Sequence, residues 1–294
     1  MKKKILITGA NSYIAKSFKN WIELSDNKEI SIDMISVRDG EWRKKDFGLY
    51  DTVMNVAGIA HVSSNPDMKD QYYKVNRDLA IDLAEKAKYD RVKQFIFLSS
   101  MIVYGEEKGL KKTNIINRDT PMKPIDFYGD SKLQADLAIQ KLEDDKFKTV
   151  VIRTPMVYGP NSKGNFPKLL AASKKFSVFP KINNKRSMIY IDVLSEFIKQ
   201  CILNDVSGVF FPQNKEYVST SDIILDTRMI LGKKTYLISI FNFLIVLLSK
   251  KGRFINRIYG NKVYERKLSN YGFSYDLNLS LRESIQKIIN EEKK

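Results

Sequence analysis

The sequence predicts an α/β fold, a doubly wound parallel sheet covered by helices on both faces, with a smaller C-terminal α/β lobe. Short apolar runs alternate along the chain with stretches of helical periodicity, and the runs cover residues 5–8, 30–37, 52–56, 94–98 and 149–152. The runs are apolar at most positions, as strands are when a parallel sheet is buried on both faces. A chain of 294 residues is long enough for such a sheet and a second lobe.

The helical segments follow the strands in order. Residues 12–24 form a helical pattern directly after the first strand, with four apolar side chains on one face: Ile14, Phe18, Trp21 and Ile22. Further helical patterns over residues 76–87 and 131–142 separate later strands. Because no repeat or low-complexity linker interrupts the chain, we expect the domain of the sheet over residues 1–158 and the smaller lobe over residues 159–294 to be interwoven.

Basic residues outnumber acidic ones by 16, and the excess is uneven. Residues 1–160 hold 27 basic and 23 acidic residues, whereas residues 161–294 hold 23 and 11. Either these are solvated lysines, or the second half faces an anionic partner such as a diphosphate-bearing substrate or a membrane surface. No helix-turn-helix, zinc or aromatic-platform pattern accompanies the charge, so nucleic acid is not an expected partner.

The chain has one cysteine, Cys201, and one histidine, His61. A lone cysteine forms no internal disulfide, and no charged-then-apolar leader precedes the first strand, so we expect a cytoplasmic protein. One cysteine and one histidine do not make a familiar metal site, and no metal is expected.

A glycine turn, Thr8-Gly9-Ala10-Asn11-Ser12-Tyr13-Ile14-Ala15, joins the first strand to the first helix. In this context a turn predicts phosphate binding, because the N–H groups and dipole at a helix start hold a pyrophosphate. Only the first of the three glycines of a Rossmann dinucleotide turn is present, but Ser12 and Ala15 in the other places are small. A plain strand-to-helix turn is the alternative. The expected cofactor-binding residues are Gly9, Asn11, Ser12, Tyr13 and Ile14.

The end of the second strand bears on the choice between NAD(H) and NADP(H). Asp33 has about the spacing of an acidic residue that accepts the adenosine ribose, but the apolar run continues to Val37 and ends at Arg38-Asp39. A guanidinium in this place pairs with a 2′-phosphate. The sequence therefore mildly favours NADP(H), with Arg38 as a ligand; the alternative for Arg38 is a solvent-exposed cation at a strand end.

Three polar residues form a candidate catalytic trio. Tyr128 and Lys132 are four residues apart on one face of a predicted helix. A lysine cation beside a phenol lowers its pKa, so that the phenol exchanges a proton with a substrate hydroxyl near neutral pH, and the same cation can hold the nicotinamide ribose. Ser100 follows the strand at residues 94–98, at the carboxyl edge where ligands bind such sheets. Ser99 is the alternative hydroxyl.

Together these motifs resemble the extended short-chain dehydrogenases/reductases of the NAD-dependent epimerase/dehydratase family. The resemblance spans nearly the whole chain, and its motifs are Gly9, Asn55-Val56-Ala57-Gly58, Asn76, Ser99-Ser100-Met101-Ile102-Val103-Tyr104-Gly105, the pair Tyr128 and Lys132, and Arg153-Thr154-Pro155-Met156-Val157-Tyr158-Gly159-Pro160. It implies that Ser100, Tyr128 and Lys132 are catalytic. It also implies that Ala57 and Gly58 pack on the cofactor, that Asn76 opens a helix at the cofactor site, and that Pro155 borders the nicotinamide. Homodimers formed through two helices are usual in similar enzymes.

The resemblance also implies substrate residues. Asn165 and Arg186 stand where similar enzymes hold a nucleotide diphosphate, Val178 lies in a stretch that lines the base, and His61 lies near the sugar. A helix N-cap is the alternative for Asn165 and a strand-edge salt bridge for Arg186. His61 is alternatively a packed, hydrogen-bonded residue.

Two absences restrict the reaction. Similar 4,6-dehydratases have an acidic pair after the catalytic hydroxyl, where this chain has Met101 and Ile102, and these cannot transfer protons. Relatives that epimerise C3 and C5 use a cysteine and a histidine, but Ile102 takes the place of the cysteine. Chemistry at C4 of a UDP-hexose or UDP-N-acetylhexosamine remains, either epimerisation or reduction of a 4-keto sugar, in the synthesis of surface polysaccharide precursors. A catalytically inactive NAD(P)-binding regulatory protein is the alternative.

An apolar stretch at residues 236–248 precedes a basic cluster: Lys250, Lys251, Arg253, Arg257, Lys262, Arg266 and Lys267. The stretch is too short to span a bilayer about 30 Å thick. We expect either an interfacial helix on anionic lipid, which allows peripheral membrane contact at the inner face, or a buried helix of the substrate lobe.

Overall fold

The computed structural model describes residues 2–25, 29–60, 65–105, 113–240, 242 and 259–293. Its centre is a six-stranded sheet in the order β10-β6-β4-β3-β1-β2, in which all pairs are parallel. The strands are β1 (Lys3–Thr8), β2 (Ile30–Ile35), β3 (Thr52–Asn55), β4 (Gln94–Ser100), β6 (Lys148–Thr154) and β10 (Gly208–Phe210). The strand order reverses beside β1, which places a ligand crevice at the carboxyl ends of β1 and β3.

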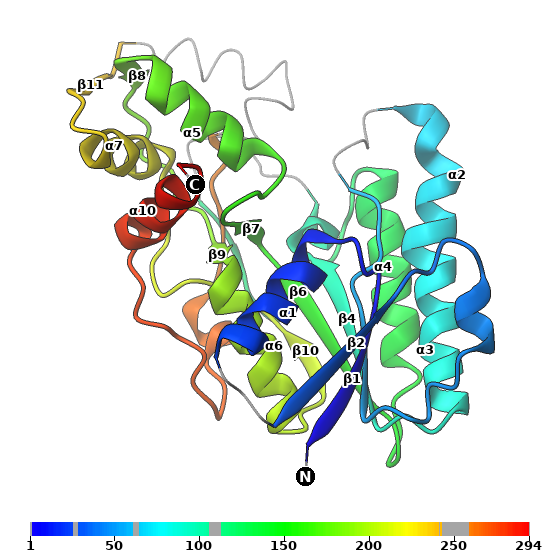
Figure 1. Ribbon diagram of the computed structural model, residues 1–294. Helices are drawn as coiled ribbons and strands as arrows, with labels where there is room; N and C mark the ends of the chain where they lie inside the picture. Colours follow the sequence, from blue (N-terminus) through cyan, green and yellow to red (C-terminus); the bar gives the residue numbers. More distant parts are fainter. Residues whose placement is uncertain are drawn as a thin grey trace.

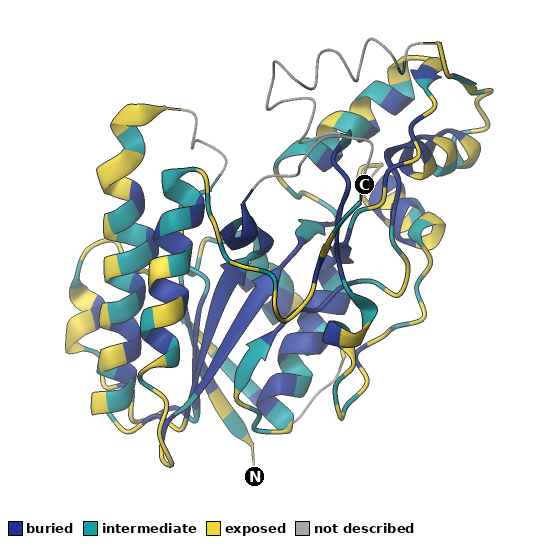
Figure 2. Ribbon diagram, turned by 180° about the vertical axis from the view of Figure 1, so that it is seen from behind, coloured by how far each residue is buried: buried dark blue, intermediate teal, exposed yellow. Residues whose placement is uncertain are grey.

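Helices cover both faces of the sheet (Figure 1). On one face lie α1 (Tyr13–Leu24) and α6 (Ile191–Leu203), and on the other lie α3 (Leu79–Tyr89) and α4 (Phe127–Gln140). The short α2 (Lys69–Tyr72) continues through a π-helical turn, Tyr73–Asp78, into α3. Side chains alternate between these layers: Ile5 and Ile7 pack toward α1 and α6, while Leu6 packs with residues of α3 and α4. The predicted doubly wound α/β fold is confirmed, and Figure 2 shows its strands as the most deeply buried layer.

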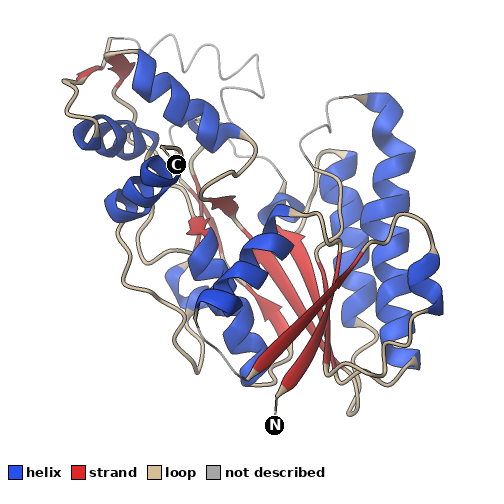
Figure 3. Cartoon of the chain, in the orientation of Figure 1, coloured by secondary structure: helices blue, strands red, loops and turns tan. Residues whose placement is uncertain are grey.

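Among the described residues, the smaller lobe contains three pairs of short parallel strands and three helices (Figure 3). The pairs join β7 (Met156–Tyr158) to β9 (Met188–Tyr190), β8 (Val178–Pro180) to β11 (Tyr236–Ile238), and β5 (Asn114–Ile116) to β12 (Lys262–Tyr264). The helices are α5 (Asn165–Lys175), α7 (Thr220–Ile230) and α10 (Leu281–Glu291). The chain crosses between the lobes more than once. β5 belongs to the smaller lobe although β4 and β6 on either side of it in sequence are in the central sheet, and α6 and β10 pack with that sheet although they follow β7 and β9 of the smaller lobe.

Among the boundaries that differ from expectation, two have a clear physical reason. β2 ends at Ile35, not Val37, because the Ile35 carbonyl accepts the N–H groups of Gly9 and Ala10, and Val37 is buried against the helical layer instead of in the sheet. α4 begins at Phe127, not at residue 131, because the Asp126 carboxylate caps it through the Gly129 N–H.

We expected a helix over residues 236–248, and this expectation is wrong for the first residues of the range. Tyr236–Ile238 is a strand, β11, paired with β8. Residues 241 and 243–248, and most of the basic cluster that follows, lie outside the described residues. Among the described residues, no helix combines the length and the apolar character that crossing a bilayer requires.

Candidate active site

The turn after β1 is shaped by Gly9. Its φ of +92° lies in the region that favours glycine, and a Cβ there would stand 2.8 Å from the Ala57 backbone nitrogen. The turn is held to β2 by the Ile35 carbonyl and closes through a bond from the Ser12 N–H to the Gly9 carbonyl, 2.8 Å. The Ser12 hydroxyl then caps α1 by accepting the Ala15 N–H at 3.1 Å, and the first turn of α1 carries no acidic residue. The helix start is therefore open to an anion.

Asn55 joins the ends of β1 and β3. Its Oδ1 accepts hydrogen bonds from the Thr8 hydroxyl and from the Ala57 N–H, both at 3.0 Å. Its Nδ2 is buried and has no acceptor among the described residues. Asn55 thus fixes the two backbone segments that border the crevice. The sequence motif contained it, but its role as the link between strands depends on a contact 47 residues apart in the chain.

Asn76 holds the loop after β3. It does not open a helix as expected but lies inside the π-helical turn, fully buried. Its amide makes two bonds with Ile59, accepting the N–H at 2.8 Å and donating to the carbonyl at 3.0 Å. A Cβ on Gly58 would meet Asn76 Oδ1 at 3.1 Å and Lys132 Nζ at 3.4 Å, so this loop lies directly against the trio. π-helical turns often occur at functional sites.

The three trio residues meet at the carboxyl edge of the sheet. Ser100 ends β4, and its hydroxyl accepts the Ile102 N–H at 3.3 Å. Tyr128 and Lys132 occupy the first two turns of α4. The Ser100 side chain hydrogen-bonds Tyr128, whose ring packs edge-on against Tyr72 at 5.7 Å between centroids. Lys132 Nζ donates to the Leu98 carbonyl at 2.9 Å.

The pKa values of the pair follow from burial. Burial raises the pKa of Tyr128 to about 12, and the hydrogen bond from Ser100 opposes this only in part. Burial lowers the pKa of Lys132 to about 8, against the attraction of Asp136, which raises it. Lys132 does not produce the expected lowering of the Tyr128 pKa in this structure, because its ammonium is turned to the Leu98 carbonyl. At neutral pH the site thus presents a phenol proton donor beside an ammonium.

A buried ion pair lies next to the trio and holds the segments that carry it. Arg153 binds Asp136 through two hydrogen bonds, both 2.9 Å, and the two side chains are 8% and 0% exposed. Asp136 also accepts the Ser99 hydroxyl at 2.6 Å, and Arg153 donates to the Tyr104 hydroxyl at 2.8 Å. Ser99 is therefore engaged in this network, which favours Ser100 as the reacting hydroxyl. Asp136 was missed by sequence reasoning; its position four residues after Lys132 was the available signal.

The remaining predicted residues are spread over both lobes. Pro155 is buried between β6 and β7. Arg38 is exposed just beyond β2, and its N–H donates to the Ser36 hydroxyl at 3.3 Å. Asp33 lies inside β2, where it accepts the Tyr50 hydroxyl at 2.6 Å, so it is not at the strand end that a ribose ligand requires.

The predicted substrate residues lie in the smaller lobe. Asn165 is the first residue of α5, whose N-cap is Gly164, so the N-cap alternative for Asn165 is wrong. The Arg186 backbone pairs with Val218 and bridges to Lys262. Val178 is half exposed on β8, at the outer end of the lobe, and His61 lies outside the described residues.

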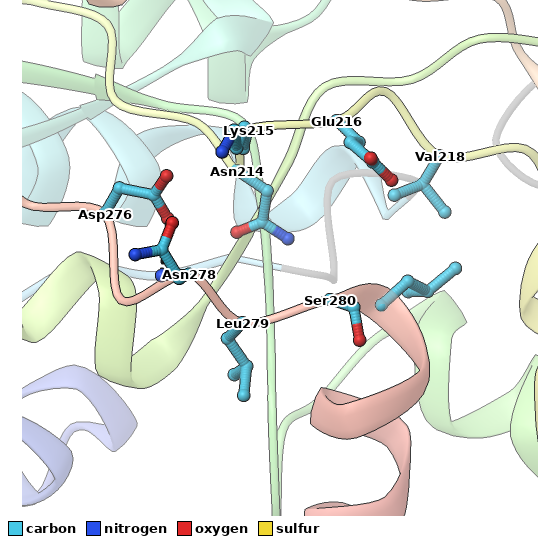
Figure 4. A pocket seen from close by; sticks show the side chains of 9 residues that line it. Asn214, Lys215, Glu216, Val218, Asp276, Asn278, Leu279 and Ser280 are labelled. Carbon is cyan, nitrogen blue, oxygen red and sulfur yellow. Dashed lines mark hydrogen bonds between the residues drawn. The ribbon is translucent and has the colours of Figure 1, made fainter.

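A separate cavity of about 190 Å³ lies in the smaller lobe (Figure 4). Its lining includes Asn214, Asp276 and Ser280, and no residue of the glycine turn or the trio. Asn214 is already engaged there, since its amide accepts the Tyr190 N–H and donates to the Tyr158 hydroxyl, both at 2.9 Å. The cavity is thus distinct from the crevice at the sheet edge.

Comparison with known proteins agrees with this geometry. Residues 5–209 match the model of the NAD dependent epimerase/dehydratase family. The chain belongs to this family. Among its relatives, UDP-glucose 4-epimerase of Vibrio cholerae is 28% identical and covers 80% of the chain and 78% of its own length. The Escherichia coli O157:H7 N-acetyl-α-D-glucosaminyl-diphospho-ditrans,octacis-undecaprenol 4-epimerase is 26% identical, covering 80% and 74%.

Solved structures share the fold of this epimerase/dehydratase. UDP-glucuronic acid 4-epimerase of Bacillus cereus, in complex with a fluorinated UDP-sugar and NAD, has a TM-score of 0.72 at 20% identity, covering 99% of both chains. A dTDP-4-dehydrorhamnose reductase of Clostridium acetobutylicum has a TM-score of 0.73 at 17% identity, covering 99% and 100%. The fold is therefore the NAD(P)-binding fold of nucleotide-sugar enzymes.

The epimerase/dehydratase has the parts that fit a nicotinamide dinucleotide. The open start of α1 and the close approach of Gly9 to Ala57 leave room for a pyrophosphate, and Gly58 leaves room beside Lys132. The cofactor class of this enzyme is thus a nicotinamide dinucleotide.

Proposed function

We propose that this enzyme is a C4 epimerase of UDP-hexoses or UDP-N-acetylhexosamines. The observation that carries the proposal is the Ser100 and Tyr128 pair with Lys132 beside it, at the sheet edge where the cofactor turn also ends. Two relatives that align over most of the chain are 4-epimerases, one of a UDP-sugar and one of a sugar on a lipid diphosphate. Synthesis of surface polysaccharide precursors is the process that such a reaction serves.

The residues act on the C4 hydroxyl. A bound nicotinamide dinucleotide supplies reversible hydride transfer. Tyr128 would take the proton of the C4 hydroxyl as C4 is oxidised and would return it as C4 is reduced from the other face of the sugar. Ser100 hydrogen-bonds the reacting oxygen, which keeps that oxygen next to Tyr128. Lys132 would hold the cofactor ribose, and its ammonium, if turned from the Leu98 carbonyl toward Tyr128, would lower the pKa of the phenol.

The residues after Ser100 argue against dehydration. Met101, Val103 and Tyr104 pack into an apolar cluster, and Met101 is 8% exposed. Apolar side chains here hold the loop and cannot move protons at C5 and C6. The chemistry is therefore confined to C4.

A 4-keto reductase is the second candidate, favoured by one observation. β2 is followed by Ser36 and an exposed Arg38, and Asp33 is bound to Tyr50 inside the strand. A hydroxyl and a guanidinium at this place suit the 2′-phosphate of NADP(H), the cofactor of net reduction. We infer a preference for NADP(H) from this arrangement.

The finer assignments complete the proposal. Residues 1–158 bind the cofactor, and residues 159–294 bind the nucleotide sugar, with Asn165 and Arg186 as its ligands and His61 near the sugar. Val178 is left out of this proposal, because its side chain is half exposed at the outer end of the lobe. The enzyme acts as a cytoplasmic homodimer and contacts the membrane from the inner face.

One paired assay tests the reaction. UDP-GlcNAc or UDP-glucose is incubated with the protein and the products are separated by chromatography, while absorbance at 340 nm follows NADPH or NADH with a UDP-4-keto-6-deoxy-N-acetylhexosamine. Formation of the C4 epimer without net cofactor change supports the epimerase, and net cofactor oxidation supports the reductase. Tyr128→Phe, which keeps the ring packing on Tyr72, is expected to lose either activity by a factor on the order of 100 or more. If wild type does neither while still binding cofactor, the inactive regulatory protein becomes the better account.

A further inference from the structure

The two strands β8 and β11 form a small sheet at the outer end of the smaller lobe (Figure 1). Val178 pairs with Tyr236, so their side chains point to the same face of this parallel sheet. Phe176 precedes Val178 by two residues and extends the same row. Phe179, which points the other way, is only 7% exposed.

The outward side of this sheet is apolar. Phe176 is 53% exposed, Val178 48%, Tyr236 56% and, two residues beyond β11, Ile240 77%. We call these four residues the outer apolar face. Parallel sheets are normally covered on both sides, and neighbouring exposed apolar side chains mark interaction surfaces. The outer apolar face therefore calls for a partner with an apolar surface.

The two chain segments that form this face carry only basic charge, although Glu292 at the end of α10 pairs with Lys174 beside it. No Asp or Glu occurs among residues 146–191 or 227–264, the two segments that contain β8 and β11, while these segments hold ten and eight Lys and Arg residues. Lys175, Lys181 and Lys234 are exposed beside the face, and Lys175 Nζ lies 5.5 Å from the centroid of the Phe176 ring. The partner must therefore be anionic as well as apolar.

These two requirements decide between partners. A second copy of this chain would bring the same cations to the contact and be repelled. Residues 241–258 are apolar and basic in sequence, so as a cover they would add positive charge instead of neutralising it. A nucleic acid would match the charge but not the apolar side chains. An anionic lipid bilayer offers both, with apolar residues at the acyl boundary and lysines among the headgroups.

We propose that the outer apolar face docks the smaller lobe onto an anionic lipid bilayer. Phe176 and Tyr236 enter the interface, while Lys175, Lys181 and Lys234 contact lipid phosphates. This docking rests on the membrane contact of the proposed function, for which it names the surface, and it is separate from the proposed reaction, because the trio lies on the other lobe.

Co-sedimentation with vesicles tests the docking. The full chain is mixed with vesicles of phosphatidylcholine containing 30% phosphatidylglycerol or of phosphatidylcholine alone, at low salt and at about 0.5 M salt, where the Debye length falls to roughly 4 Å. Binding is expected only with phosphatidylglycerol and at low salt. Each cation contributes about five-fold to partitioning, so Lys175→Gln/Lys181→Gln/Lys234→Gln is expected to bind on the order of 100-fold more weakly.

A matched pair of variants tests the apolar part. Phe176→Ser/Tyr236→Ser should lose vesicle binding, whereas Tyr89→Ser, which removes an aromatic residue 86% exposed on α3, should keep it. All variants should retain the wild-type melting temperature within about 2 °C, because the residues changed are exposed. Tyr128→Phe should dock like wild type, which separates docking from turnover.

Three results would overturn the proposal. The first is equal binding to both vesicle types or to none. The second is loss of binding by Tyr89→Ser as well as by the Phe176 and Tyr236 variant. The third is a Phe176→Ser/Tyr236→Ser protein that still binds vesicles. If that protein also melts at a clearly lower temperature or changes its mass in solution, the outer apolar face is assigned to residues 241–258 or to a second copy.

Discussion

Replacing Asp136 tests whether the buried ion pair with Arg153 holds the catalytic edge in place. Asp136 is fully buried and accepts two hydrogen bonds from Arg153, one from Ser99 and one from Gln140 at 2.6 Å. In Asp136→Asn the shape is kept but the negative charge is lost, and the amide nitrogen faces donors instead of acceptors. The Arg153 guanidinium then remains buried without a counterion.

The expected loss in free energy of unfolding is about 3–5 kcal/mol, the usual cost of removing one partner of a buried pair. Arg153→Met should cost a similar amount, because it leaves Asp136 as a buried unpaired carboxylate. The double variant should lose at least about 2 kcal/mol less than the two single losses added together, since neither charge then remains alone. Asp136 also raises the pKa of Lys132. In Asp136→Asn the Lys132 ammonium should therefore lose its proton at a lower pH, and activity should begin to fall with rising pH earlier than in wild type.

Urea unfolding followed by circular dichroism gives these three energies in the absence of cofactor. The pH profile of turnover gives the pH at which activity declines in Asp136→Asn. If the ion pair had only a structural role, this pH would not change. The reasoning is refuted if Asp136→Asn unfolds within 1 kcal/mol of wild type, or if the single losses are additive.

Three further changes follow from the same structure. The pKa of Lys132 is about 8, below its ordinary 10.5, so between these values the unfolded chain binds a proton that the folded chain does not, and stability rises with pH. Lys132→Met should remove this slope and gain up to about 3 kcal/mol at pH 7. Gly9→Ala forces a strained φ and a contact at 2.8 Å, so it should cost about 1–3 kcal/mol and weaken cofactor binding, whereas Gly232→Ala, with open space around it, should cost less and leave binding intact. Arg228→Lys should cost about 2–4 kcal/mol, because its six hydrogen bonds to five backbone and hydroxyl oxygens need the full guanidinium, while Arg282→Lys at an exposed ion pair should cost under about 1 kcal/mol.

Unfolding curves from pH 6 to 10 check the Lys132 prediction, and a wild-type curve without slope above pH 8 would contradict it. Titration with NADPH and NADH checks Gly9→Ala; unchanged affinity would mean that the turn does not hold the cofactor. For Arg228 the decisive comparison is with Arg282, and equal losses in urea unfolding would remove the argument from burial.

The strands could be predicted because their apolar runs are buried from both sides. The same reasoning failed at Val37, whose burial comes from the helical layer and not from strand pairing. It also failed at β11, where three residues make a strand only because β8 lies beside them. Pairing between segments that are distant in the chain leaves no local pattern, so short strands such as β10 and β11 were not predicted.

The catalytic edge shows the same division. Tyr128 and Lys132 share one helix face, so their proximity follows from spacing alone. Asp136 lies on α4 and its partner Arg153 lies 17 residues away on β6, and the link made by Asn55 spans 47 residues. The pKa values of Tyr128 and Lys132 could not be predicted from the sequence either, because they depend on burial and on the carbonyl group that Lys132 contacts.

The pairing of β12 with β5 has a consequence for how the enzyme is made. Lys262 donates to the Gly105 carbonyl across 157 residues of sequence, and the Tyr264 hydroxyl donates to the Arg153 carbonyl across 111. The loop after Ser100 therefore gains its last supports only when residues near 264 have left the ribosome. The catalytic edge can therefore be complete only after nearly the whole chain has been made, whereas the strands and the turn around Gly9 lie in its first part.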